Sequence, residues 1–121
     1  MQRGIIIGAE SNIASAVRHL LEDVIEIDWE VCSEVSGVNN EVFQSASMVV
    51  FNFLEEDDSL NKLLAALRIV PSSKLVVFGY VDEEIFIKEL CKIGVQYYLP
   101  FNSSRLEVGQ AINQVLATKA R

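Results

Sequence analysis

The sequence predicts an α/β protein in which helices cover both faces of a parallel β-sheet. The first observation is the run of residues 48–53, which has one polar side chain and no alternation, as in a strand buried on both faces. The second is that five apolar runs along the chain are each followed by a segment of helical periodicity. Parallel strands alternating with helices are joined by right-handed crossovers, which produces three layers, α/β/α.

The N-terminal residues predict a strand and then a helix. Residues 5–7 are β-branched and are followed by Gly8, which ends the strand. Ser11 or Asn12 can cap a helix, because apolar residues recur at the helical period from there to Val24.

The next segment gives weaker signals. Residues 29–35 alternate between two sets of side chains, which predicts an edge strand with one wetter face. Within residues 37–46, Val38, Val42 and Phe43 predict a short, loosely packed helix. The central strand at residues 48–53 follows.

After the central strand, Ser59 is expected to begin a helix that Pro71 stops. The apolar stripe of this helix is predicted to be Leu60, Leu63, Leu64 and Leu67. Residues 74–78 predict the fourth strand, which ends at Gly79.

The C-terminal part repeats the same pattern twice. Asp82 is expected to cap a helix that ends at Gly94, and residues 97–99 predict the fifth strand. Ser103 or Ser104 is expected to cap the last helix. That helix should pack through Val108, Ala111, Ile112 and Val115.

The length, composition, net charge and cysteine positions limit the class of protein. The 121 residues predict one domain, 1–121, and half of them are hydrophobic, which excludes disorder. The net charge of −7, with no cluster of Lys or Arg, argues against nucleic-acid binding. Without a membrane-length apolar run or a secretory segment, we expect a cytoplasmic protein with no membrane partner. Cys32 and Cys91 stand far apart, so we expect buried thiols rather than a metal site or disulfide.

Asn52 is the polar residue of the central run and comes near its carboxyl end. Ligands of open α/β sheets lie outside the carboxyl ends of the strands, so a site would be expected around Asn52. An acidic stretch at residues 55–58 follows, without the spacing of a Ca²⁺ loop.

End to end, the chain resembles a response-regulator receiver domain, particularly receivers that precede a LuxR/NarL-type helix-turn-helix. Three segments carry the resemblance: "RGIIIGAESNIASAVRHLLE", "SMVVFNFLEEDDSLNKLLAALR" and "KLVVFGYVDEEIFIKELCKIGVQYYL". It implies a CheY-like, flavodoxin-like fold with five parallel strands in the order 2-1-3-4-5 and five helices. It also implies two-component signalling, typically in transcription control.

Matched position by position, the chain lacks the receiver's phosphorylation site. The acidic pair that holds Mg²⁺ falls on Gly8 and Ala9, and the phosphoacceptor aspartate falls on Asn52. The Thr or Ser that binds the phosphoryl group falls on Gly79. We therefore expect no metal, no cofactor and no catalytic residue, because an amide cannot form an acyl phosphate and Mg²⁺ prefers carboxylate ligands.

Two further family positions lie near the fifth strand. The conserved lysine falls on Phe101 without a gap, or on Leu99 if the family's proline is matched to Pro100. Neither register supplies a lysine. The aromatic switch position matches Tyr98.

The fourth predicted helix has more apolar residues than one core stripe needs. If Ile87 stays exposed with either Ile85 or Tyr98, the apolar patch marks a contact site. The resemblance places partner or dimer contacts on the face formed by the fourth helix, fifth strand and fifth helix. The predicted interaction residues are Ile85, Ile87, Tyr98 and Leu99.

The sequence thus favours a phosphorylation-independent receiver-like domain that regulates by protein contact and is not an enzyme. The alternative is a small-ligand module of nucleotide type, using the turn at residues 8–12 and the Gly79 loop, where two glycines leave room. A third reading is an inert spacer within a transcription factor.

Overall fold

The computed structural model of the chain describes residues 3–8, 12–32, 40–53 and 58–119. Five parallel strands form one sheet in the order β2-β1-β3-β4-β5, which confirms the predicted flavodoxin-like topology. The strands are β1 (Arg3–Ile7), β2 (Asp28–Cys32), β3 (Met48–Phe53), β4 (Leu75–Gly79) and β5 (Tyr97–Pro100). The helices are α1 (Asn12–Val24), α2 (Asn40–Ser45), α3 (Ser59–Ile69), α4 (Glu84–Lys92) and α5 (Arg105–Lys119), with a 3-10 turn, η2, at Ser72–Lys74.

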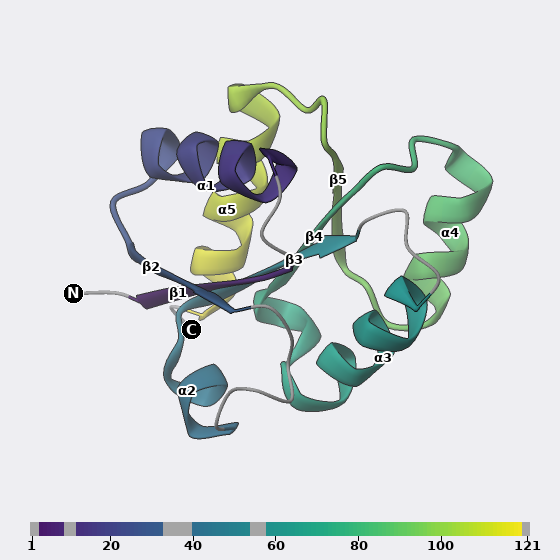
Figure 1. Cartoon of the computed structure of the whole chain (residues 1–121), viewed down its shortest axis with the longest axis horizontal. Coiled ribbons are helices and arrows are strands. Elements are labelled where there is room, and N and C mark those ends of the chain that lie inside the picture. Colours follow the sequence, from purple (N-terminus) through teal and green to yellow (C-terminus); the bar gives the residue numbers. More distant parts are fainter. Residues whose placement is uncertain (1–2, 9–11, 33–39, 54–57, 120–121) are drawn as a thin grey trace.

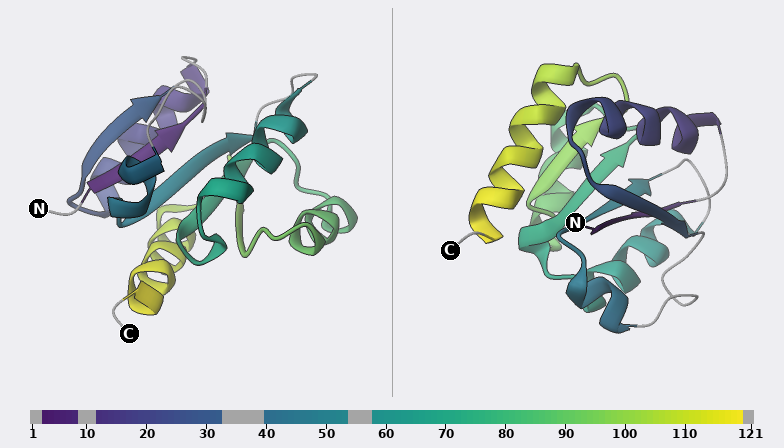
Figure 2. Two further views of the ribbon diagram at one scale, coloured as in Figure 1. Left: turned by 90° about the horizontal axis from the view of Figure 1, so that it is seen from below. Right: turned by 90° about the vertical axis from the view of Figure 1, so that its left-hand side faces the viewer.

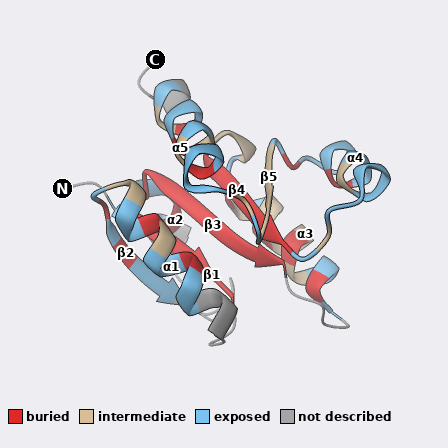
Figure 3. Cartoon of the chain, turned by 90° about the horizontal axis from the view of Figure 1, so that it is seen from above, coloured by how far each residue is buried: buried red, intermediate tan, exposed pale blue. Residues whose placement is uncertain are grey.

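The sheet separates two apolar clusters. Helices α1 and α5 cover one face, and α2, α3 and α4 lie on the other (Figures 1 and 2). Every residue of β3 is buried, as predicted for a strand packed on both faces (Figure 3). Alternate β3 residues enter the two clusters, so Asn52 points to the α1–α5 side with Val50, and Phe53 points to the α3–α4 side.

Strand β2 lies at the edge of the sheet, as its mixed pattern predicts. Trp29 is buried and lies across Gly4 of β1, so that a Cβ on Gly4 would come 2.5 Å from Trp29 Cε3. Glycine is therefore required at residue 4 to make room for the indole. Residues 33–35 of the expected strand lie outside the described residues.

Helix α2 is packed more tightly than predicted. Phe43 is fully buried, and the Lys74 ammonium donates hydrogen bonds to the carbonyls of Gln44 (2.9 Å) and Ala46 (3.1 Å) at the end of the helix. Lys74 itself belongs to η2 rather than to a strand, because Pro71 breaks the chain before β4. A buried cation thus holds the C-terminal carbonyls of α2, which the sequence pattern did not indicate.

Three expected details are wrong. Leu60 is 47% exposed, because α3 turns Ser59, Leu63 and Ala66 toward the sheet. Asp82 does not cap α4, whose N-cap is Glu83 with no side-chain hydrogen bond. Cys91 is exposed, because only Leu90 is buried in its part of α4, while Cys32 is half-buried.

Helix α5 begins as predicted. Ser104 accepts a hydrogen bond from the Glu107 N–H (3.2 Å), and the Glu107 carboxylate accepts one from the Ser104 N–H (3.0 Å). This reciprocal pair is a capping box. It lowers the pKa of Glu107, chiefly through the Ser104 backbone N–H. Val108, Ile112 and Val115 are buried against the sheet, with Ala111 half-buried.

Candidate functional site

The strand order brings four of the five receiver-site positions to one edge of the sheet. Gly8 follows β1, Asn52 lies in β3, and Gly79 ends β4 in register with Phe53. The Phe101 N–H then donates a hydrogen bond to the Gly79 carbonyl at 2.9 Å. Ala9 lies outside the described residues. Four positions, two glycines, one amide and one phenyl ring, therefore meet where parallel α/β sheets usually bind ligands.

Asn52 is buried beside Gly8. Its side chain is 3% exposed, and neither amide atom hydrogen bonds to another described residue. Gly8 has φ +153°, a conformation that favours glycine, and a Cβ there would lie 2.8 Å from the Asn52 Cβ. Residue 8 therefore has no space for an acidic side chain while the β1 end and β3 keep these positions.

The space next to Gly79 is filled by Tyr98. A Cβ on Gly79 would overlap the Tyr98 hydroxyl and would come 2.7 Å from two ring carbons, Cε2 and Cζ. The hydroxyl donates a hydrogen bond to the Val81 carbonyl (2.6 Å) and accepts one from the Val81 N–H (3.1 Å). Tyr98 thus binds β5 to the loop between β4 and α4, and it does so in the volume that a threonine or serine at residue 79 would need.

The phenol of Tyr98 stays neutral over the physiological range. Burial raises the pKa of Tyr98 to about 12, and the hydrogen bond from Val81 opposes this shift. Because the neutral hydroxyl both donates and accepts here, deprotonation would cost the bond to the Val81 carbonyl.

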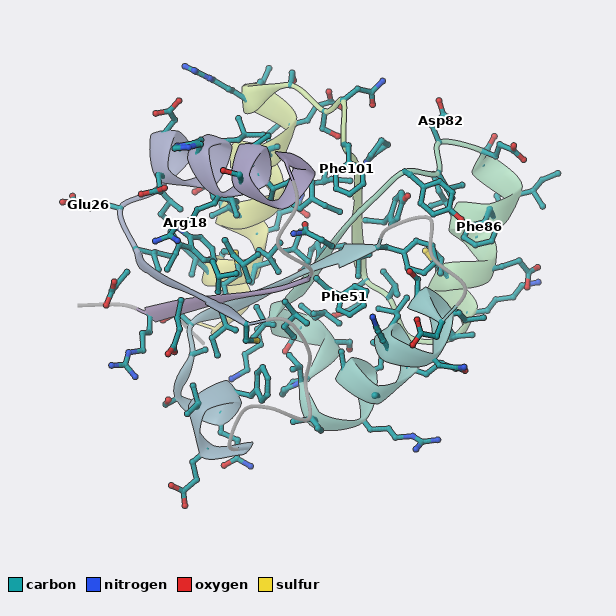
Figure 4. All side chains as sticks on the ribbon, viewed as in Figure 1. Arg18, Glu26, Phe51, Asp82, Phe86 and Phe101 are labelled. Carbon is teal, nitrogen blue, oxygen red and sulfur yellow. The ribbon has the colours of Figure 1, made fainter. Side chains whose placement is uncertain are left out.

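Both candidate lysine positions carry apolar side chains that pack into the core. Leu99 and Phe101 lie half-buried against the α1–α5 cluster. Figure 4 shows the Phe101 ring between the start of α1 and the end of β5. In either alignment register, the position of the family's lysine therefore carries a hydrophobic side chain packed in the core instead of a cation.

The four described positions at this edge carry none of the side chains that phosphoryl transfer by the usual chemistry uses. That reaction needs a carboxylate nucleophile, a metal held by oxygen ligands, and donors or cations around the phosphoryl oxygens. Among the described residues, no three His, Cys, Asp or Glu side chains gather as metal ligands. The four positions at this edge offer one buried amide, two glycines and one phenyl ring.

Comparison with known proteins identifies the fold. No family model and no curated protein matches the chain. A response regulator receiver domain protein from Clostridium thermocellum is similar in structure, with a TM-score of 0.74 and 18% identity over 99% of this chain and 98% of that one. A LuxR-family two-component response regulator from Aurantimonas has a TM-score of 0.68 and 15% identity over 96% of this chain and 85% of that one.

The chain has the fold of a response-regulator receiver domain. A putative pilus assembly-related protein from Burkholderia pseudomallei shares this fold, with a TM-score of 0.75 and 10% identity over 96% of this chain and 90% of that one. At such identities the likeness establishes the fold, and the chemistry has to be argued from the residues of this chain.

Within this receiver fold, helix α4 is the most exposed element. Of the predicted interaction residues, Ile85 is 78% exposed, whereas Ile87 is half-buried. Tyr98 is turned inward to Val81 and Leu99 packs toward α5, so neither adds a free apolar side chain. The interaction surface itself stays a prediction. The sequence had indicated surplus apolar residues on α4, but not Tyr80, which is 46% exposed in the preceding loop.

Neighbouring side chains occupy the space expected for a small ligand beside Gly8 and Gly79, and residues 9–11 of that turn lie outside the described residues. Asn52 fills the space at Gly8, and Tyr98 fills the space at Gly79. The glycines therefore reflect close packing of neighbouring side chains, and this correction removes the reason for placing a nucleotide there. No helix among the described residues is long and apolar enough to cross a membrane.

Proposed function

We propose that this chain is a receiver-type regulatory domain that acts through protein contacts and is not itself phosphorylated. The observation that carries the proposal is the buried amide of Asn52 at the acceptor position, packed against a glycine that leaves no space for a metal-binding acid. The receiver fold supports a regulatory role rather than catalysis. We place this role in cytoplasmic two-component-type signalling, with transcription control as the output.

The proposal implies that one conformation of the carboxyl edge predominates. In a receiver that is switched by phosphorylation, the residues around the acceptor must be free to rearrange when the phosphoryl group adds negative charge. Here the two hydrogen bonds between Tyr98 and Val81 hold the β4–α4 loop in place, and the Tyr98 ring occupies the space next to Gly79. Regulation then comes from the partner or second copy that contacts the α4, β5 and α5 face, not from a covalent signal.

The direct test uses acetyl phosphate, or beryllofluoride as a phosphoryl mimic, each with Mg²⁺. We expect no phosphoryl mass shift and no Mg²⁺-dependent change in the amide NMR spectrum around Asn52. A receiver with a complete acidic site, treated in parallel, shows that the reagents work. A Mg²⁺-dependent adduct or chemical-shift change at Asn52 would overturn the proposal.

The variant Asn52→Asp separates loss of the acceptor from loss of the whole site. It restores the carboxylate but neither the acids at residues 8 and 9 nor a lysine. We therefore expect this variant also to stay unphosphorylated. Efficient Mg²⁺-dependent phosphorylation of Asn52→Asp would show that the surrounding residues still stabilise the transferred group.

A further inference from the structure

Helix α4 and the loop before it carry an exposed apolar patch, formed by Tyr80, Ile85 and Phe86 and called here the α4 patch. Their exposed fractions are 46%, 78% and 36%. Along α4, only Leu90 is buried (Figure 3). Exposed apolar side chains that gather at one place, unlike scattered ones, mark contact surfaces.

The patch is built on a rigid base. The ring of Phe53, buried at the end of β3, stacks on Tyr80 with a centroid distance of 5.7 Å and an interplanar angle of 11°. The centroid of the same ring lies 6.1 Å from the centroid of the Phe86 ring. Because one buried ring supports both exposed aromatic residues, the patch needs little ordering when a partner binds.

The segment that carries the patch, residues 80–87, has charges of one sign. Asp82, Glu83 and Glu84 are consecutive and exposed, and no Lys or Arg occurs between residues 80 and 87. Asp82 points away from the sheet at the turn before α4 (Figure 4). The nearest cation along the helix, Lys88, pairs with Glu84 at 3.7 Å. An anionic partner would be repelled, and a cationic one attracted.

A second copy of this chain fits the patch poorly. Across a two-fold axis the same patch meets itself, which would bring the carboxylates of both copies to one interface. The chain also carries a net charge of −7, so two copies repel each other at longer range.

We propose that the α4 patch docks a basic amphipathic segment of a partner protein. Its apolar side chains cover Tyr80, Ile85 and Phe86, and its Lys or Arg side chains pair with Asp82 and Glu83. This inference rests on the proposed function and adds the chemical nature of the partner.

The test uses a dye-labelled synthetic peptide of leucine and lysine, about 18 residues long with helical spacing, followed by fluorescence anisotropy at physiological salt. We expect it to bind, and the same peptide with glutamate in place of lysine not to bind. Ile85→Ser should weaken binding about tenfold. Val31→Ser, which removes a valine 38% exposed on β2 at the opposite edge of the sheet, should leave it unchanged.

A second pair of variants tests the charge. Asp82→Asn with Glu83→Gln should weaken binding roughly threefold and reduce its salt dependence. Glu26→Gln with Asp28→Asn removes the same charge from two exposed residues and should have little effect. Glu26 lies across the molecule from Asp82 (Figure 4), and Asp28 begins β2 at the far edge of the sheet. Amide shifts on binding should map to residues 80–87.

Equal effects of Ile85→Ser and Val31→Ser, or of the two charge variants, would overturn the inference, as would amide shifts confined to another face. Self-association in sedimentation equilibrium that Ile85→Ser abolishes would assign the patch to a second copy instead. None of these variants touches Asn52, so failure here is distinguishable from failure of the phosphorylation test.

Discussion

The close approach of the Tyr98 ring to Gly79 leads to a prediction for the stability of the variant Gly79→Ala. The added methyl group would lie on the Tyr98 hydroxyl and 2.7 Å from the ring carbons Cε2 and Cζ, distances that no packed structure tolerates. The ring is the group that must move, because Gly79 lies in β4 between β3 and β5.

Displacing Tyr98 has a cost that follows from its contacts. The variant loses two hydrogen bonds to Val81, worth about 0.5–1.5 kcal/mol each. Exposing more of the half-buried ring adds about 1 kcal/mol. Alanine in place of glycine recovers about 0.5–1 kcal/mol in a strand. We expect Gly79→Ala to lower the free energy of unfolding by roughly 1–3 kcal/mol.

Urea denaturation of a double-mutant cycle measures this coupling. In the background of Tyr98→Ala the obstacle is gone, so Gly79→Ala should be neutral or slightly stabilising. The coupling energy between the two substitutions should be about 1–4 kcal/mol. If Tyr98→Ala folds too poorly to measure, Tyr98→Leu serves as the background, since it also removes the hydroxyl and the outer ring atoms.

Equal destabilisation by Gly79→Ala in both backgrounds would refute the reasoning, because the cost would then not depend on the tyrosine. A fully stable Gly79→Ala variant with the tyrosine intact would do the same. The predicted result would support a closed edge at which Tyr98 replaces the side chain that phosphorylated receivers use.

Four further predictions can be checked by urea denaturation. Gly4→Ala should cost about 1–3 kcal/mol, because the added Cβ meets a rigid indole. Gly109→Ala in α5 should gain about 0.5–1 kcal/mol, because a Cβ there would lie at an ordinary 3.6 Å from Val24 Cγ1 of α1. Lys74→Met should cost about 2–3 kcal/mol, since it removes the donor to two carbonyls at the end of α2; equal stability would show that the ammonium does not hold the helix. The folded pKa of Tyr98, about 12 against an ordinary 10, means that its contribution is present below pH 10 and is lost as the pH rises through 12, and Tyr98→Phe should remove this part of the alkaline loss. Asn52→Asp should be destabilising at neutral pH by about 1–3 kcal/mol and recover toward acid pH, while Asn52→Leu should be no less stable than the parent chain.

Much of the fold could be predicted from the sequence alone. Strand β3 could be predicted because a strand buried on both faces has no polar alternation. The other strands were predicted from short apolar runs with glycine or proline at their ends. The end-to-end spacing also identified the receiver topology and the positions where acids, acceptor and lysine are missing. Apolar runs and the spacing between them are properties of neighbouring residues, so they can be recognised in a single sequence.

The packing at the site depended on the tertiary structure. Gly8 and Gly79 were expected to leave room, yet side chains from other strands, Asn52 and Tyr98, fill it. Such contacts join residues far apart in the chain, and the periodicity of the sequence does not indicate which side chain will occupy the space beside a given glycine. The direction of each apolar residue on α4 is similarly decided by the rotation of the helix on the sheet.

The sequence by itself determined the parallel α/β architecture of this protein. It also predicts that the receiver-site positions lack the residues of the phosphorylation chemistry. Residue types fix which reactions are possible, since glycine, an amide and a phenyl ring cannot supply a nucleophile, a metal ligand or a cation. The tertiary structure decided that the edge is closed and that the exposed surface lies at Tyr80, Ile85 and Phe86. Volume and exposure are properties of neighbours in space, which only the folded chain defines.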